Sequence, residues 1–129
     1  MARLEFKSPH DGSLLTFMLT GRTTEEVTFD VAVKTPWFSG STGSSTYMVP
    51  PLTSLFQEMA DEWSGWKAEK KWSDLEGRVQ FEVTTDSTGH VCMKTTLNAP
   101  DYDSWLHVKL MFEAGQLEAM ARDLKHLFT

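Results

Sequence analysis

The sequence predicts an α+β domain built from an antiparallel sheet of about six strands, with two helices on one face of that sheet. Two observations lead to this prediction. Stretches in which apolar and polar residues alternate occur in two groups of three, and each group is followed by a stretch with the period of an amphipathic helix. The expected order is therefore three strands, a helix, three strands and a helix, in a single domain that spans residues 1–129.

The alternating stretches have the length of strands, and residues that favour turns separate them. They lie at Arg3–Lys7, 14–20, 26–34, 76–85, His90–Asn98 and 104–113. The third shows the clearest alternation, because Val27, Phe29, Val31 and Val33 share one face, while the other carries Thr28, Asp30, Ala32 and Lys34. Such alternation is typical of antiparallel strands that bury one face and leave the other in solvent.

Two stretches have the apolar spacing of a helix that covers a core. The first begins at Pro50 and Pro51, because proline is tolerated in the first turn, and Gly65 is expected to end it. Its apolar face contains Leu52, Leu55, Phe56, Met59 and Trp63. The second helix covers residues 115–128, and its apolar face contains Leu117, Met120, Ala121, Leu124 and Phe128.

Residues 35–49 connect the third strand to the first helix and are rich in Gly, Ser and Thr. We expect this segment to be the longest loop of the chain. Long loops in compact domains are often functional or mobile. Trp37, Phe38 and Tyr47 are unusual in such a segment, and they either hold the loop against the domain or contact a partner.

The composition restricts the classes of function. The chain has 12 basic and 18 acidic residues, and a formal net charge of −6 disfavours nucleic acid and suits a basic protein as partner. No apolar run reaches the roughly 18 residues that a membrane span requires. The only cysteine, Cys92, excludes an internal disulfide and fits a reducing compartment. We therefore expect a cytoplasmic protein that binds neither nucleic acid nor a membrane.

The most specific stretch of sequence is rich in tryptophan. It contains the motifs WSGW (63–66) and WSDLEG (72–77), and EAGQLE (113–118) follows near the end of the chain. These motifs resemble a family of small bacterial proteins that is catalogued only as a domain of unknown function. The resemblance covers residues 56–128. It implies a bacterial, cytosolic setting, and it implies no activity, ligand or catalytic residue.

The residue types that usually carry chemistry are not grouped in the sequence. None of His10, His90, His107 and His126 has another ligand at a standard metal-binding spacing, and His90 with Cys92 supplies only two of about four zinc ligands. No phosphate-binding glycine loop or nucleophile elbow is present, and the paired acidic residues lie at turns or on solvated faces. The sequence therefore predicts no catalysis, no metal and no cofactor.

The outward face of the last three strands is the main candidate for a partner site. Hairpins that are symmetric about their turns would place Trp105 near Thr96 and His107 near Lys94. Exposed aromatic rings beside charged groups are typical of interface hot spots. The candidate contact residues are Trp105, His107, Lys94, Glu82 and Met111 on this face, and Trp66, Trp72 and Trp37 outside it. The alternative is a solvated sheet face whose tryptophan is covered by residues 35–49 or by a second copy of the chain.

Two functions remain open. The first is a non-catalytic protein-interaction protein, in its sharpest form an immunity or inhibitor protein that masks a basic bacterial partner such as a toxin. The second is a small-molecule-binding domain, with a pocket between sheet and helices that residues 35–49 gate. The apolar wall of that pocket would be Phe29, Phe81, Met93 and Phe112. The chain would act as a monomer, or as a homodimer that pairs sheet edges or faces.

Overall fold

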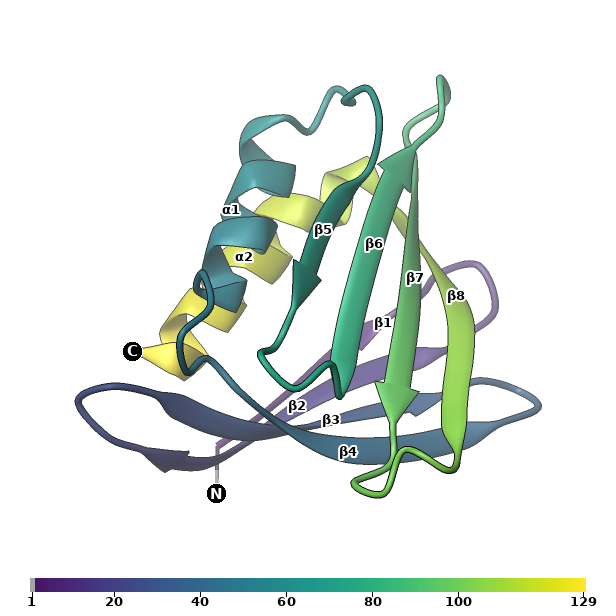
Figure 1. Cartoon of the computed structure of the whole chain (residues 1–129). Coiled ribbons are helices and arrows are strands. Elements are labelled where there is room, and N and C mark those ends of the chain that lie inside the picture. Colours follow the sequence, from purple (N-terminus) through teal and green to yellow (C-terminus); the bar gives the residue numbers. More distant parts are fainter. Residues whose placement is uncertain (1) are drawn as a thin grey trace.

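The computed structural model describes residues 2–129, and these residues form eight strands and two α-helices (Figure 1). The strands belong to two antiparallel sheets of four strands each, in which every strand pairs with the next along the chain. The prediction of an α+β fold with antiparallel strands and two helices is confirmed. The prediction of one sheet of about six strands is wrong, because two further strands are present and the strands divide into two sheets.

Each sheet is followed by one helix. Sheet A contains β1 (Arg3–Lys7), β2 (Leu14–Arg22), β3 (Val27–Lys34) and β4 (Ser39–Ser45). The helix α1 (Leu52–Asp61) separates it from sheet B, which contains β5 (Lys70–Ser73), β6 (Val79–Thr85), β7 (His90–Asn98) and β8 (Trp105–Glu113). A short 3-10 turn (Ala114–Gln116) leads into α2 (Leu117–Phe128). The strands absent from the prediction are β4 and β5.

The two sheets lie across one another, and both helices pack together in the space that the sheets enclose (Figure 1). Both sheets and both helices therefore contribute side chains to the core. Phe17 of β2, Phe56 of α1 and Phe81 of β6 form an aromatic triangle with ring centroids 6.2–6.5 Å apart. Burying one such side chain stabilises the fold by roughly 1.5–3 kcal/mol. The alternating apolar residues of both halves of the chain thus pack into one common core.

The strand β4 consists only of Gly, Ser and Thr, and it joins the two sheets through close contacts. Its small side chains lie against the ends of sheet B at every second position. The contacts join Gly40 to Leu106, Thr42 to Asn98 and Ser44 to Asp74. The last two are hydrogen bonds of 2.8 and 2.6 Å, and a Cβ atom on Gly40 would lie 3.2 Å from the Leu106 side chain. A strand with larger side chains could not approach sheet B this closely.

The tryptophans near α1 differ from the prediction. The helix ends at Asp61, four residues before the expected stop at Gly65, so Trp63 lies beyond the apolar face and is 64% exposed. The prediction that Trp63 is a core residue is therefore wrong. Trp72 lies in β5, one of the two strands absent from the prediction, and it is only 5% exposed. Its indole N–H donates a 2.7 Å hydrogen bond to the carbonyl of Pro50, just before α1.

The remaining apolar positions of both helices are buried or partly buried as predicted. In α1 the buried residues are Leu52, Leu55, Phe56 and Met59, and in α2 they are Leu117, Met120, Ala121 and Leu124. Over residues 2–129, neither helix combines the length and the apolar character that crossing a membrane requires.

Candidate functional site

Five of the predicted contact residues lie on the outer face of sheet B. Trp105 is 69% exposed, His107 is also exposed, and Lys94, Glu82 and Met111 are half-buried. The strand register differs from the expected one by two residues. Trp105 pairs with Asn98, His107 with Thr96, and Glu82 with Lys94. A shift of two residues leaves every side chain on the same face, so the composition of the face is unchanged.

The charge of this face does not suit a basic partner. Lys94 lies between Glu82 on β6 and Lys109 on β8, and Lys71 lines the same shallow hollow of about 280 Å³. Glu69 pairs with Lys71 at 3.3 Å and Glu113 of β8 lies on the same face, so three glutamates balance the three lysines. Like charges on directly opposite residues, such as Lys94 and Lys109, are unfavourable in a sheet. The face as a whole therefore carries no excess of negative charge that would attract the basic protein that the net charge favours.

The three tryptophans predicted outside this face have different environments. Trp72 is buried, so it is removed from the set of contact residues. Trp66 is half-buried. Its indole N–H donates to the carbonyl of Val83 at 3.2 Å, and the Lys70 ammonium lies 5.2 Å from its ring centroid. Trp37, at the tip of the β3–β4 hairpin, is 85% exposed. Only Trp37 of the three presents most of its ring to solvent.

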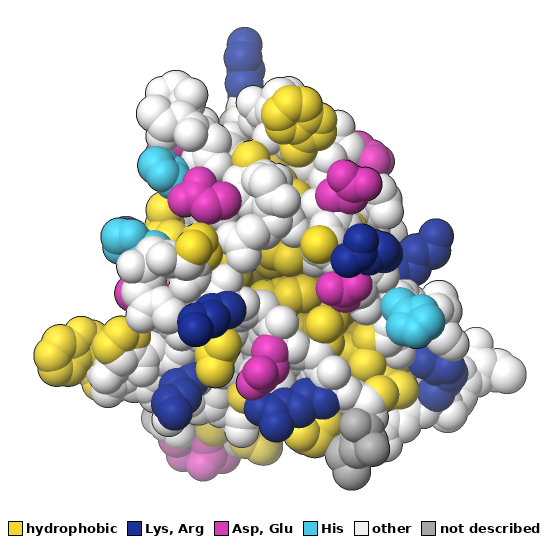
Figure 2. Space-filling model, turned by 180° about the vertical axis from the view of Figure 1, so that it is seen from behind, with side chains coloured by type: hydrophobic (Ala, Val, Ile, Leu, Met, Phe, Trp, Pro, Cys, Tyr) yellow, Lys and Arg dark blue, Asp and Glu magenta, His cyan; other side chains and the backbone are white. Residues whose placement is uncertain are grey.

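A different surface collects the exposed apolar residues. We call it the β4 corner and define it as β4, residues 35–38 and 46–48 beside it, residues 74–78 and 99–105 of sheet B, and Glu26 and Asp30. Among residues 2–129, seven of the eight exposed large hydrophobic side chains belong to it. They are Trp37, Phe38, Tyr47, Met48, Leu75, Tyr102 and Trp105. Figure 2 shows hydrophobic side chains projecting from the side on which the β3–β4 hairpin lies. Clustered exposed apolar groups mark interaction sites.

Local hydrogen bonds fix these apolar groups in position. The hydroxyl of Thr35 accepts the backbone N–H groups of Trp37 and Phe38 at 3.3 and 3.0 Å, which orders the hairpin tip. The hydroxyl of Tyr102 donates to the carbonyl of Glu76 at 2.7 Å, which joins the two turns of sheet B. Tyr102 and Met48 have the left-handed φ values of 59° and 56°. Such strained residues tend to occur at functional sites.

The β4 corner also carries most of the net charge. Its acidic residues are Glu26, Asp30, Asp74, Glu76, Asp101 and Asp103, and its one basic residue is Arg78. The chain has 18 acidic and 12 basic residues in total, so the rest of the chain holds 12 acidic and 11 basic residues and is nearly neutral. A hollow of about 380 Å³ in the corner is lined by four of these carboxylates together with Tyr47 and Leu75. Arg78 also lines the hollow, so its lining carries four acidic residues and one basic residue, and this negative excess favours cations.

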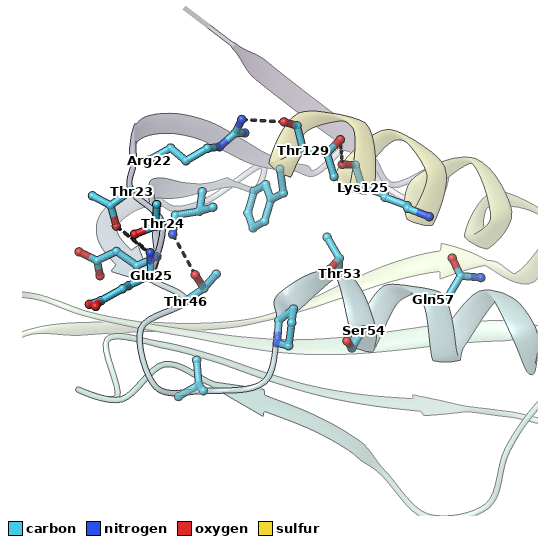
Figure 3. A pocket seen from close by; sticks show the side chains of 15 residues that line it. Arg22, Thr23, Thr24, Glu25, Thr46, Thr53, Ser54, Gln57, Lys125 and Thr129 are labelled. Carbon is cyan, nitrogen blue, oxygen red and sulfur yellow. Dashed lines mark hydrogen bonds between the residues drawn. The ribbon is translucent and has the colours of Figure 1, made fainter.

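Another hollow measures about 650 Å³ and shares Glu26 and Thr46 with the edge of the β4 corner (Figure 3). It is bounded by the β2–β3 hairpin, residues 46–51, the start of α1 and the end of α2. The four residues of the expected wall do not line this hollow but lie in the core with at most 2% exposure, namely Phe29, Phe81, Met93 and Phe112. The expected gate is also corrected, because β4 occupies its middle and only residues 46–49 border the hollow.

A cluster of titratable side chains lies outside both the β4 corner and the 650 Å³ hollow, at the turn between β6 and β7. A carboxylate oxygen of Asp86 accepts the backbone N–H groups of His90 and Thr88 at 3.0 and 2.8 Å. His90 Nδ1 faces Asp86 at 3.0 Å, and its Nε2 faces Glu113 at 3.5 Å. These carboxylates lie at different nitrogens of the ring, and over residues 2–129 no three His, Cys, Asp or Glu side chains converge on a possible metal position. The cluster therefore orders the turn.

The Asp86 cluster makes stability depend on pH. The His90 backbone N–H, followed by the Thr88 hydroxyl, holds the pKa of Asp86 well below its usual range. A lowered pKa in the folded state stabilises the fold above the unfolded value of about 3.9, and this contribution disappears as the pH falls. We expect the difference in unfolding free energy between the wild type and Asp86→Asn to shrink from pH 6 to pH 3 in urea denaturation. Glu58→Gln, at an exposed position of α1, is the control, and an equal change in both variants would contradict this role.

Residues 7–129 match a family model described as "Family of unknown function (DUF6228)". No curated protein matches the chain. The sequence motifs pointed to a family of unknown function only over residues 56–128, and the match extends this to most of sheet A and to α1. The β4 corner thus lies entirely inside the matched region.

Proposed function

The chain belongs to this family of unknown function, and we propose that it is a non-catalytic protein that binds a basic segment of a protein partner at the β4 corner. One observation carries the proposal. The surface that holds seven exposed large hydrophobic side chains also holds six carboxylates and one basic residue. Aromatic anchors supply binding energy at protein interfaces, and complementary charge supplies orientation and speed of association.

The division of roles follows from the positions of the residues. Trp37 and Trp105 are 85% and 69% exposed and are the largest exposed side chains of the corner, so they would enter apolar pockets of the partner. The carboxylates of Glu76, Asp101 and Asp103 lie on the β5–β6 and β7–β8 turns and would pair with lysine or arginine side chains. In its most specific form, the proposal is a cytoplasmic immunity or inhibitor protein of bacteria that covers a basic partner in a one-to-one complex.

Two matched tryptophan variants test whether Trp105 anchors the partner. The tagged protein is used to isolate partners from its own host, and the affinity for a captured basic protein is then measured by calorimetry. We expect Trp105→Ala to weaken binding by thirtyfold or more, as truncation of a hot spot does. Trp63→Ala is the control, because Trp63 is about as exposed as Trp105 but lies outside the β4 corner. Equal losses in the two variants, or no loss in either, would refute the anchor.

The charge is tested by a second matched pair. Asp101→Asn with Asp103→Asn removes two charges from the β4 corner and keeps the side-chain shape. Glu58→Gln with Glu118→Gln removes two charges from exposed positions on the helices. We expect the first pair to slow association and reduce its dependence on salt, whereas the second changes neither. An acidic partner, or equal effects of both pairs, would count against the proposal.

A further inference from the structure

The strand β8 is the last of sheet B, and among the strands of residues 2–129 none pairs with its outer edge. We propose that the partner's basic segment is extended and pairs with this edge as a fifth strand of sheet B. This inference rests on the proposed function, because the segment belongs to the same partner and would end at an acidic turn of the β4 corner. It is carried by unbonded backbone groups, by exposed apolar side chains beside them, and by opposite charges at the two ends of the edge.

The backbone groups of β8 alternate between two directions. Even-numbered residues face β7, as shown by the 2.9 Å hydrogen bond from the N–H of Ala114 to the β6–β7 turn. Odd-numbered residues face the edge, where the side chains of Ser8 and Gln116 bond to the carbonyl of Met111 and the N–H of Glu113. Across residues 2–129, the backbone groups of the other odd-numbered residues of β8 make no such bond, namely Trp105, His107 and Lys109. An unpaired edge of this kind is a template for another strand.

The inner side of the same stretch is apolar and incompletely covered. Leu106 and Val108 are directed toward the core but are only half-buried, whereas Leu110 and Phe112, farther along β8, are buried. A strand added at the edge would cover Leu106 and Val108 with its own inward side chains. Covering apolar surface in this way gains roughly 25 cal/mol for each Å² removed from water. The free backbone groups and the half-buried side chains therefore coincide over residues 105–109.

The strand β4 marks the place of the added strand. It crosses the ends of the strands of sheet B, where Ser44 contacts the β5–β6 turn, Thr42 the end of β7 and Gly40 the β8 side chain Leu106. The next residue with the same orientation is Phe38, one step farther in the direction in which the β3–β4 hairpin extends past β8 (Figure 1). Phe38 is 66% exposed, because the chain supplies no strand at this position. An added strand would cover its ring.

The charges along the edge select the segment and its direction. Lys109 lies at one end of the free stretch, and Asp101 and Asp103 precede the other end at Trp105. All strand pairs of both sheets are antiparallel, and we expect the same of the added strand. The segment would then have an acidic residue near its N-terminal end and lysine or arginine at its C-terminal end. Apolar residues at every second position would point inward.

A second copy of the chain is a poorer occupant of this edge. Two chains with a formal net charge of −6 repel each other. Each copy would also bring its own β3–β4 hairpin, which extends past β8, into the space beside the edge (Figure 1). A single extended segment needs only the spacing of one strand, about 4.8 Å.

The test uses the synthetic peptide Glu-Val-Thr-Val-Lys-Val-Lys with both ends blocked. It is added to the ¹⁵N-labelled full chain, and amide hydrogen exchange is followed by NMR. We expect the amides of Trp105, His107 and Lys109 to exchange about tenfold more slowly, or slower still, with saturating peptide, because each gains a hydrogen bond. Leu106 and Val108 should be protected with and without peptide, because their N–H groups face β7.

Two N-methylated peptides test whether the backbone is paired. In the first, the threonine and the first lysine are methylated, whose N–H groups would face β8. We expect it to bind about tenfold weaker or more, since it loses two hydrogen bonds. In the second, the first two valines are methylated, whose N–H groups would face solvent, and its affinity should stay within about threefold of that of the parent peptide.

A matched pair of variants tests the place of the strand. Phe38→Ala should weaken the parent peptide about tenfold. Trp63→Ala is the control, because Trp63 is 64% exposed but lies outside the β4 corner, and it should bind like the wild type. The spectra also report whether each variant remains folded.

Three outcomes would overturn the added strand. The first is equal binding of both methylated peptides, or no protection of the edge amides at about 1 mM peptide. The second is a set of shifts confined to residues 99–103, which would leave the proposed function in place. The third is protection of the edge amides in concentrated protein without peptide, which would assign the edge to a second copy. Because the peptide replaces the natural partner, a failure here is distinct from a failure of the Trp105→Ala test.

Discussion

Replacing Trp72 by alanine is expected to lower the free energy of unfolding by about 3–5 kcal/mol, the range for truncating a buried aromatic residue. Trp72 is 5% exposed, and its ring lies 6.2 Å from Phe81 of sheet B and 6.5 Å from Phe29 of sheet A, between centroids. The substitution would therefore open a cavity between the two sheets. It would also leave the Pro50 carbonyl without its 2.7 Å hydrogen bond. Urea denaturation measures the effect.

Two further variants separate the causes. Trp72→Phe keeps part of the packing but removes the indole N–H, so its effect measures the hydrogen bond and the smaller ring together, and it should lie between the wild type and Trp72→Ala. Trp105→Ala should change the unfolding free energy by no more than about 0.5 kcal/mol, because its ring is exposed. Similar small effects of Trp72→Ala and Trp105→Ala would show that Trp72 does not connect the sheets.

The fold was predictable where side chains report on one buried face. Six strands and both helices have clear periodicity, because each buries one face of its own against the core. The inward positions of these strands, such as Phe17, Phe81 and Phe112, are buried as alternation predicts. The same alternation cannot tell which strands share a sheet, since a strand has the same pattern in one large sheet or in two smaller ones. The division into two sheets was therefore not predictable.

The missed elements have physical reasons. The strand β4 contains no large apolar residue, because its inner positions approach the ends of sheet B, and a composition of Gly, Ser and Thr resembles a loop. The strand β5 has four residues, too few to show a period. Trp63 matches the apolar spacing of α1, but the helix ends at Asp61 before that position is reached. Spacing alone does not show where a helix stops.

The candidate site was predictable only in part. Trp37 and Trp105 were singled out from the sequence, and both belong to the β4 corner. Their proximity to the acidic turns depends on how β4 crosses sheet B, which joins segments far apart in the chain. A local signal did exist, because Leu75 and Tyr102 each lie between acidic residues at a turn, where large apolar side chains are unusual. The 650 Å³ hollow had no such signal, since its walls come from four separate segments.

Replacing Asp74 by alanine is expected to lower the free energy of unfolding by about 3 kcal/mol or more, since hydrogen bonds to a charged group each contribute about 1.5–3 kcal/mol. Asp74 is 7% exposed, and its carboxylate accepts the Ser44 hydroxyl at 2.6 Å and the Arg78 backbone N–H at 2.7 Å. The first bond links β4 to sheet B, and the second closes the turn before β6. Removing the carboxylate leaves both donors unpaired in a mostly buried place, which adds to the loss.

A double-mutant cycle isolates the bond that joins the sheets. If the Ser44 hydroxyl acts through Asp74, then Ser44→Ala and Asp74→Ala together should lower stability less than the two separate effects combined, with a coupling of about 1–3 kcal/mol. Ser41 provides the control, because it lies on the opposite face of β4 and is exposed, so Ser41→Ala and Asp74→Ala should be additive within about 0.5 kcal/mol. Additivity of the Ser44 pair would mean that the link between sheets rests on packing around Gly40 and Thr42. Coupling would instead show that the Asp74 carboxylate fixes the position of β4. The exposed rings of Trp37 and Phe38 precede β4 in the chain, so their position depends on the position of this strand.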